Sequence, residues 1–310
     1  MQHDDEGADG PLLVPHMLYG TFRRESTGYR TVCRSPGLGD ALARGAQRFC
    51  EGWGGCVEAG FTTAVAHQAL STTEPSGEAR LRFLVIRVTN LGTDHKGRQG
   101  ALCFHVAFFD EDAYARVGFE PFTFNQSGSL LGDWDGRASW PPLFIDPASL
   151  PQPTAPDVDQ ALLPVLRDHL LHLLAGHALR FAGRLPSAAS DQHVALLFRL
   201  LPWSSRRKLA AATFTFSSRR DYGLAVEHSE HGRVDPLRPQ PLPSLPRDLA
   251  QAVTAYADEM IDALGRRDLG RIQTLARSSN PHAVPPPPAA HPEPRSVLGR
   301  LFGRDRRTTS

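Results

Sequence analysis

Two stretches rich in Val, Ile and Phe, Leu81–Thr89 and Ala101–Phe109, give the clearest hydrophobic pattern of the chain. The turn-forming segment from Asn90 to Gly100 separates them, so the pattern predicts a β-hairpin. Along the second stretch two sets of residues alternate: Leu102, Phe104, Val106 and Phe108 on one face, and Ala101, Cys103, His105 and Ala107 on the other. Because neither face is fully polar, we expect a central strand covered on both sides, with a helix packed closely on the small-residue face.

Two shorter strands and a helix are predicted before this hairpin. The strands are Leu18–Phe22 and Tyr29–Arg34, and a Ser-Pro-Gly turn follows the second one. Asp40 is expected to cap the next helix. The apolar residues of that helix recur at helical spacing and predict its buried stripe: Leu42, Ala46, Phe49 and Trp53.

The second half of the chain has mainly helical patterns. The segment Gly118–Pro156 is dense in Gly, Pro, Trp and Phe and has little periodicity, so it predicts a long irregular loop. Two helices are then expected, at about Ala161–Phe181, with Pro164 in the first turn, and at Ala188–Leu201. Two strands follow, at Ala212–Ser217 and Tyr222–Val226. Two further helices are expected at Arg247–Leu264 and Leu269–Ala276.

Together these elements predict an α+β fold. A mixed or antiparallel sheet surrounds a central hairpin at about 81–109, helices pack on it, and the C-terminal part is helical. The expected organisation runs as follows: a disordered N-terminus (1–15), an N-terminal α+β domain (16–146), a linker (147–157), a helix-rich section (158–277) and a Pro-rich, disordered tail (278–310). The pattern leaves open whether the two sections form one domain or two.

Composition narrows the class of protein. Among 310 residues, Lys plus Arg number 34 and Asp plus Glu number 33, which removes the broad electrostatic argument for a nucleic-acid or membrane partner. No apolar run reaches the roughly 18 to 20 residues needed to span a bilayer, so no integral membrane segment is expected. The cysteines (Cys33, Cys50, Cys56 and Cys103) lack Cys-x-x-Cys spacing and are typical of core residues in a reducing compartment. The N-terminus is acidic and polar rather than a signal peptide, so we expect a cytoplasmic protein.

The sequence signals for a metal site and for a nucleotide site are weak. Asp168 and His172 stand one helical turn apart and could face one ion, but such a pair is equally an ordinary surface pair. The turn Ser35–Asp40 leads into a helix, yet it lacks the Gly-Lys-Ser/Thr ending of a phosphate loop and the Gly-x-Gly-x-x-Gly fingerprint. We therefore expect no cofactor and no metal.

Nucleophilic chemistry is an alternative that the sequence leaves open. Cys33, Cys103, His67 and His105 supply the residue types of a Cys/His-dependent hydrolase, but no local signature joins them. His105 lies on a predicted strand face dominated by Ala and Cys. It is therefore expected to be a hydrogen-bonded core residue rather than a catalytic base.

Basic residues form several short clusters. Those at Arg206-Arg207-Lys208, Arg219-Arg220 and Arg266-Arg267 do not interleave with aromatics and are interpreted mostly as solvated turns. The end of the tail combines an apolar face with arginines: Val297, Leu298, Leu301 and Phe302 beside Arg300 and Arg304. This pattern predicts a peptide that binds a protein partner or docks peripherally on an anionic surface, and a plain disordered tail is the alternative.

A tyrosine-led strand followed by a glycine and a Ser-Pro-Gly element stands near the start of the chain, at Tyr19-Gly20, Gly28-Tyr29 and Ser35-Pro36-Gly37-Leu38. Further on, Leu200-Leu201-Pro202 precedes Arg206-Arg207 and Phe214-Thr215-Phe216. This combination resembles the N-terminal domain of bacterial GTPase-associated proteins, the accessory subunits of predicted NTP-dependent conflict systems. The resemblance implies a non-catalytic adaptor that works beside a GTPase, with these turns serving the fold or a partner surface.

Overall fold

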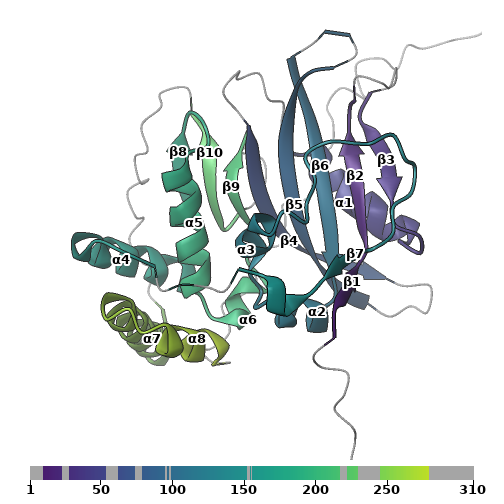
Figure 1. The fold of residues 1–310 in the computed structure, drawn as a ribbon. Helices are drawn as coiled ribbons and strands as arrows, with labels where there is room; N and C mark the ends of the chain where they lie inside the picture. The colour runs from purple at the N-terminus through teal and green to yellow at the C-terminus, as the bar shows by residue number, and fades with distance from the viewer. Residues whose placement is uncertain are drawn as a thin grey trace, which may run out of the picture.

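The computed structural model describes residues 10–22, 28–53, 62–73, 79–94, 96–97, 99–151, 154, 156–216, 222–229 and 245–278. Its centre is an eight-stranded mixed sheet in the order β3-β2-β6-β5-β4-β9-β10-β8, and β1 and β7 form a separate two-stranded ribbon. Helices cover the sheet, as Figure 1 shows. The α+β class expected from the sequence is confirmed.

The predicted hairpin is one of the two long antiparallel pairs of the sheet. It consists of β5 (Ala79–Thr93) and β6 (Gln99–Phe109), with Phe83 opposite Phe109 and Thr89 opposite Cys103. Next to β6 lie β2 (His16–Gly20) and β3 (Arg30–Arg34), so the two short strands expected upstream are also present. The described part of the hairpin therefore forms the middle of the sheet.

One long strand, β4 (Thr63–Thr73), was not predicted. It pairs with β5 along its whole length and with β9 (Ala211–Thr215) through only two residue pairs, Ala66 with Ala212 and His67 with Ala211. Two further hydrogen bonds strengthen this contact. The Val65 amide donates to the Thr213 hydroxyl (3.0 Å), and His67 Nδ1 bonds the Leu209 carbonyl (3.0 Å).

The C-terminal strands run parallel to one another. β10 (Leu224–His228) lies between β9 and β8 (Leu179–Gly183). The two strands expected around 212–226 are thus present as parallel neighbours, and the turn expected at Arg219–Asp221 lies outside the described residues. Between β8 and β9 the chain passes through α5 (Ala188–Leu200) and the single-turn α6 (Trp203–Arg206), as a crossover between parallel strands requires.

Both faces of β6 are buried, as predicted. The large-residue face packs with α1 (Asp40–Glu51), whose buried residues include Ala46 and Phe49. The small-residue face meets α2 (Glu111–Arg116) near Phe109, together with α3 (Pro121–Gln126) and the ribbon of β1 (Leu12–Val14) and β7 (Leu143–Ile145). At its centre, however, the segment around Leu131–Trp140 covers His105, so the closely packed helix expected there is replaced by a loop.

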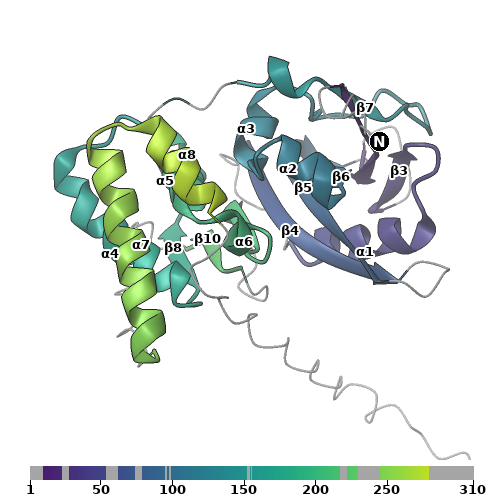
Figure 2. The ribbon, with the colours of Figure 1, turned by 90° about the horizontal axis from the view of Figure 1, so that it is seen from below.

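A layer of helices stands beside the C-terminal strands. α4 (Leu163–Leu174), α7 (Arg247–Gly265) and α8 (Leu269–Arg277) pack on one another and on α5, and Figure 2 shows them grouped away from the hairpin. The predictions for α5, α7 and α8 agree with these bounds to within two residues. Among the described residues, no helix is long and apolar enough to cross a membrane.

Several boundaries differ from the sequence prediction, most clearly in three places. The helix expected up to Phe181 ends at Leu174 because Gly176 adopts φ 82°, which stops the helix and lets β8 begin at Leu179. Gly39, not Asp40, caps α1, and the Asp40 carboxylate instead accepts a hydrogen bond from Arg34 (2.5 Å). The segment Gly118–Pro156 is not wholly irregular: it contains α3, β7 and the 3₁₀ turn Pro147–Ser149.

His67 yields a prediction about pH. Its ring is fully buried, stacked on Phe83 (6.2 Å between centroids) and Tyr114 (5.4 Å), and burial lowers the pKa of this imidazole to about 4. The unfolded chain takes up the proton near pH 6.5 while the folded chain does not, so stability is full above pH 6.5 and falls as the pH drops toward 4. Between pH 7 and pH 5, His67 should account for about 2 kcal/mol of lost stability.

Urea unfolding of the native chain and of His67→Gln at both pH values measures this contribution. Glutamine can still donate to the Leu209 carbonyl but does not titrate in this range. The variant should therefore lose about 2 kcal/mol less between pH 7 and pH 5 than the native chain. An equal loss in both proteins would show that His67 is not held neutral in the folded state.

Candidate functional site

The tail residues chosen from the sequence lie outside the described part of the chain. Val297, Leu298, Arg300, Leu301, Phe302 and Arg304 all fall beyond Ser278, the last residue that the structure describes. Their role in binding a partner therefore stays a prediction.

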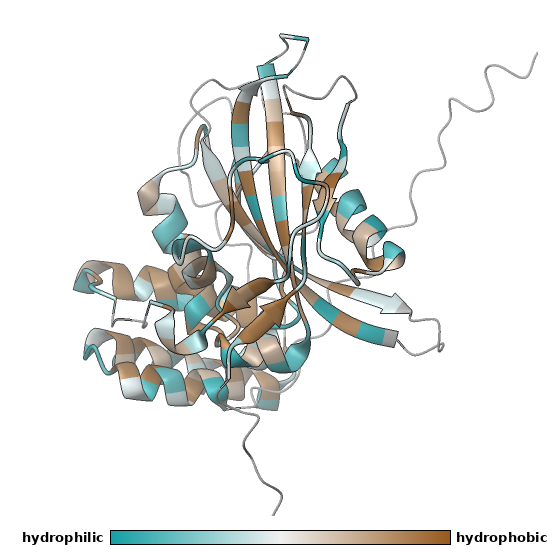
Figure 3. Ribbon diagram, turned by 45° about the vertical axis from the view of Figure 1, so that its right-hand side comes forward, coloured by the Kyte–Doolittle hydropathy of each residue, from teal (hydrophilic) through white to brown (hydrophobic). Residues whose placement is uncertain are grey.

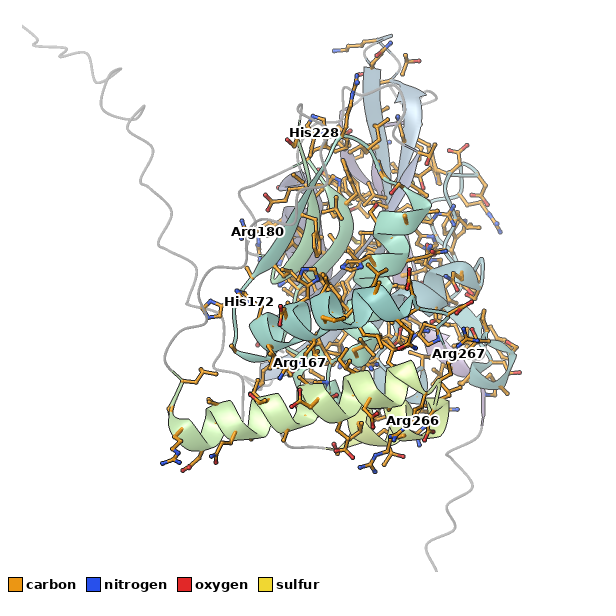
Figure 4. The ribbon with its side chains drawn as sticks, turned by 90° about the vertical axis from the view of Figure 1, so that its left-hand side faces the viewer. Arg167, His172, Arg180, His228, Arg266 and Arg267 are labelled. Atoms are coloured by element: carbon orange, nitrogen blue, oxygen red, sulfur yellow. The ribbon has the colours of Figure 1, made fainter. Side chains whose placement is uncertain are left out.

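The candidate metal pair on α4 is not assembled into a site. Asp168 is largely exposed, whereas the His172 ring is buried and lies 5.6 Å from that of His177. Within the described ranges, no three His, Cys, Asp or Glu side chains come together as a metal site. The neighbouring Arg167 instead binds Asp258 (2.6 Å) and joins α4 to α7, between which Figure 4 shows it.

His105 belongs to a short chain of hydrogen bonds beneath the loop that covers β6. The Leu131 amide donates to its Nδ1 (2.7 Å), its Nε2 bonds Nδ1 of His16 (2.7 Å), and Nε2 of His16 bonds the Pro141 carbonyl (2.8 Å). All ring nitrogens are satisfied if each neutral ring carries its proton on Nε2. Burial lowers the pKa of His105 to about 3, which fits two neutral rings. The expectation of a hydrogen-bonded core histidine is confirmed.

The thiols near His105 are not activated. Burial raises the pKa of Cys103 to about 12 and that of Cys33 to about 11, so both remain protonated at neutral pH. Both nitrogens of His105 bond other groups and neither bonds a thiol. The geometry therefore does not support the Cys/His hydrolase.

The residues that carry the family resemblance hold the edge of the sheet. The Tyr29 hydroxyl accepts from the Leu102 amide (3.0 Å) and donates to the Gly100 carbonyl (3.1 Å). A side chain at Gly20 would bring its Cβ to 2.6 Å from the Leu102 carbonyl oxygen, so only glycine fits there. The Ser35 hydroxyl accepts from the His16 amide (3.0 Å). These residues serve the fold.

A cleft of about 220 Å³ lies where the two halves of the chain meet. Figure 2 shows α2 and α3 on one side of this region and α6 and α8 on the other. Arginines dominate its polar lining: Arg116, Arg199, Arg206 and Arg277, with Glu120 as the carboxylate. We call it the arginine cleft, and it is the candidate functional site.

Arg206 anchors the arginine cleft. Although only 3% exposed, its guanidinium donates to the Glu120 carboxylate (2.9 Å), the Gly118 carbonyl (3.0 Å) and the Leu201 carbonyl (2.9 Å), and also to the Arg199 carbonyl. Burial raises the pKa of Glu120, while Arg206 and Arg199 act in the opposite direction. The sequence interpretation of this arginine as part of a solvated turn is wrong, because four acceptors replace water around it.

The backbone before Glu120 adopts an unusual conformation. Gly118 has φ 70°, and Phe119 has φ 51°, a value that residues with a side chain rarely adopt. The conformation is fixed by packing, since the Phe119 ring is buried against Tyr114 (5.0 Å between centroids) and Trp203 (5.2 Å). This conformation ends α2. It also places the Gly118 carbonyl and the Glu120 carboxylate so that both accept hydrogen bonds from the Arg206 guanidinium.

Sequence reasoning missed Glu120, Arg199 and Trp203 as members of one site. Glu120 lies 79 residues before Arg199 and 83 before Trp203, and no spacing relates it to them, so the contact exists only in the folded protein. The single available signal was Leu201-Pro202 before Arg206, which carries part of the resemblance.

The comparisons with known proteins agree with that resemblance. Residues 14–144 match the family described as GTPase-associated protein 1, N-terminal domain type 2, which confirms the resemblance over this part of the chain. The match ends within β7, so the segment with Leu201-Pro202 and Arg206 lies beyond it. Neither the curated proteins nor the solved structures gave a match.

Replacement of Arg206 measures how much the stability of the fold depends on the contact between Arg206 and Glu120. Arg206→Met leaves the Glu120 carboxylate buried without its main partner, which should cost about 3–5 kcal/mol of unfolding free energy. Arg206→Met combined with Glu120→Leu should recover most of that loss because no unpaired charge remains. Denaturant titration of the single and double variants measures both effects.

Arg207→Met is the matched control, since Arg207 pairs with Glu111 (2.5 Å) at the surface. It should change stability by less than about 1 kcal/mol. A loss in Arg206→Met as small as that of the control would contradict the assignment of Arg206 as a structural anchor.

Thiol labelling tests the inertness of the cysteines. A Cys56→Ser variant leaves Cys33, Cys50 and Cys103, all buried. Ellman's reagent should leave this folded variant unlabelled and react with all three cysteines after denaturation, because buried, protonated thiols are poor nucleophiles. Rapid, selective labelling of Cys33 or Cys103 in the folded protein would restore the Cys/His hydrolase as a candidate.

Proposed function

We propose that this protein is a non-catalytic, cytoplasmic adaptor that binds a GTPase or a related signalling or conflict-system protein. The observation that carries the proposal is the match of residues 14–144 to the GTPase-associated domain. The neutral, covered histidine pair and the raised pKa values of Cys33 and Cys103 support a role without nucleophilic catalysis.

The β1–β7 ribbon offers a surface for such a partner. Leu13 and Phe144 are direct cross-strand neighbours, and they are 68% and 69% exposed. Their strand neighbours Leu12, Val14 and Ile145 face the core, so the ribbon is apolar on both faces, and Figure 3 shows its two short strands in brown. Single exposed apolar residues are common, but an adjacent Leu and Phe on one small face is typical of a protein-binding surface.

The position of the ribbon links this surface to the matched domain. Leu13 directly precedes the first matched residue and Phe144 is the last one. The pair therefore lies where the two ends of the domain come together. We infer that the GTPase-like partner packs an apolar surface against Leu13 and Phe144.

The tail supplies a second contact in this proposal. Its apolar face of Val297, Leu298, Leu301 and Phe302 lies beside Arg300 and Arg304 and could bind the same partner or dock peripherally. Deletion of residues 279–310 separates the two contacts, because it removes the tail and leaves the ribbon intact.

The test co-purifies this protein with the products of its neighbouring genes and measures by calorimetry its binding to an NTPase found among them. Leu13→Ser combined with Phe144→Ser should weaken binding by at least about tenfold, as expected for central apolar contacts. The control, Leu162→Ser with Val165→Ser, alters two other exposed apolar residues (51% and 43%) and should bind as the native chain does.

Two results would argue against the proposal. The first is that the native chain binds no neighbouring NTPase under conditions that preserve weak complexes. The second is that the ribbon variant and its control bind equally well, which would exclude Leu13 and Phe144 from the interface. Circular dichroism and thermal unfolding of both variants show whether the fold is retained.

A further inference from the structure

The arginine cleft carries more positive charge than its own residues neutralise. Four guanidiniums line it, and Glu120 is the one carboxylate among its lining residues. Arg277 lies over the Trp203 ring (5.6 Å), and among the described residues neither Arg277 nor Arg116 forms an ion pair. A partly enclosed site with excess guanidinium charge attracts anions strongly, because the apolar walls lower the local dielectric constant.

Two polar side chains of the cleft, Glu120 and Arg199, are also incompletely hydrogen-bonded. Glu120 is only 8% exposed, yet its Oε2 has no hydrogen-bond partner in the described structure. Nε of Arg199 makes no hydrogen bond either and lies 3.7 Å from Oε1 of Glu120, and its Nη2 makes one long hydrogen bond to Thr123 (3.4 Å). The terminal nitrogens of Arg199 are therefore the donors that it can offer to a further acceptor.

Size and lining restrict what could enter. The volume of about 220 Å³ is below the range of about 300–1,000 Å³ usual for drug-sized ligands, so the ligand is small. Val117, Leu150 and Ile272 supply apolar walls, and Trp203 adds an aromatic one. A ligand with an apolar body and a single charged end fits this combination.

We propose that the arginine cleft is a binding site for a small organic carboxylate with an apolar body. A carboxylate is planar and accepts two parallel hydrogen bonds from a guanidinium, which Arg199 and Arg277 can offer. The Glu120 carboxylate in the same cleft repels anions, and it repels a dianion more strongly than a monoanion. A carboxylate therefore binds better than a phosphate dianion. The apolar body lies against Val117, Leu150 and Ile272.

Phenylacetate is the probe, and its uncharged isostere phenylacetamide is the matched control ligand. Calorimetric titration of the full chain should give saturable binding of phenylacetate and at least about tenfold weaker binding of phenylacetamide, since charge-assisted hydrogen bonds are lost. Inorganic phosphate should not displace phenylacetate at equal concentration. The NTPase-binding assay is separate, so the two proposals can fail independently.

Variants locate the site. Arg277→Gln should weaken phenylacetate binding about tenfold, because one guanidinium is removed without disturbing Arg206. Arg271→Gln is the control on the same helix, since Arg271 pairs with Glu259 and does not line the cleft. Thermal unfolding confirms that both variants are folded.

Three results would overturn the proposal. One is equal binding of phenylacetate and phenylacetamide, which would show that charge is not recognised. Another is unchanged phenylacetate binding in Arg277→Gln, which would place the ligand elsewhere. The third is displacement by inorganic phosphate as effective as by phenylacetate itself, which would reduce the cleft to a general anion site.

Discussion

The pairing of β4 with β9 is the constraint on which the rest of the fold depends. Only Ala66–Ala212 and His67–Ala211 are in register there, yet this contact joins an antiparallel set of strands to a parallel set. Without it each set would expose an open edge with unpaired amides and carbonyls. The alanines allow close packing, and the His67 and Thr213 side chains extend the ladder with hydrogen bonds of their own.

Arg206 forms a second connection between the first half of the chain, which holds the antiparallel strands, and the second half, which holds the parallel strands. Its guanidinium binds Gly118 and Glu120, which belong to the first half of the chain, and Leu201, which belongs to the second. Because one guanidinium is shared among backbone carbonyls and a carboxylate, its position fixes both sides of the arginine cleft. The shape of the cleft is therefore in large part a consequence of how the two halves are joined, and the segment Pro147–Pro151 completes its wall.

Periodicity predicted the elements whose burial shows in their own residues. The β5–β6 hairpin and helices α5, α7 and α8 have apolar patterns strong enough to be recognised locally. β4 does not, since Thr63–Thr73 consists mostly of Ala, Thr and other small or polar residues and becomes a central strand only because β5 and β9 flank it. Glu120 was missed and Arg206 was assigned to a solvated turn for a related reason: burial of a charge depends on a partner distant in sequence.

Within the matched segment, the residues that carry the family resemblance and the residues of the two proposed sites are different, whereas Arg206, beyond that segment, belongs to both sets. Gly20, Tyr29 and Ser35 form hydrogen bonds or close contacts within the sheet and have little left to offer a partner. Leu13 and Phe144 face outward, and Arg277 lacks a carboxylate partner in the described structure, so these side chains retain unused binding capacity. Substitutions at the ribbon or in the cleft can therefore leave the scaffold intact, because Leu13, Phe144 and Arg277 make none of the hydrogen bonds that Tyr29 and Ser35 form at the sheet edge. The resemblance therefore identifies the scaffold, and the two proposals assign binding to the ribbon and to the arginine cleft.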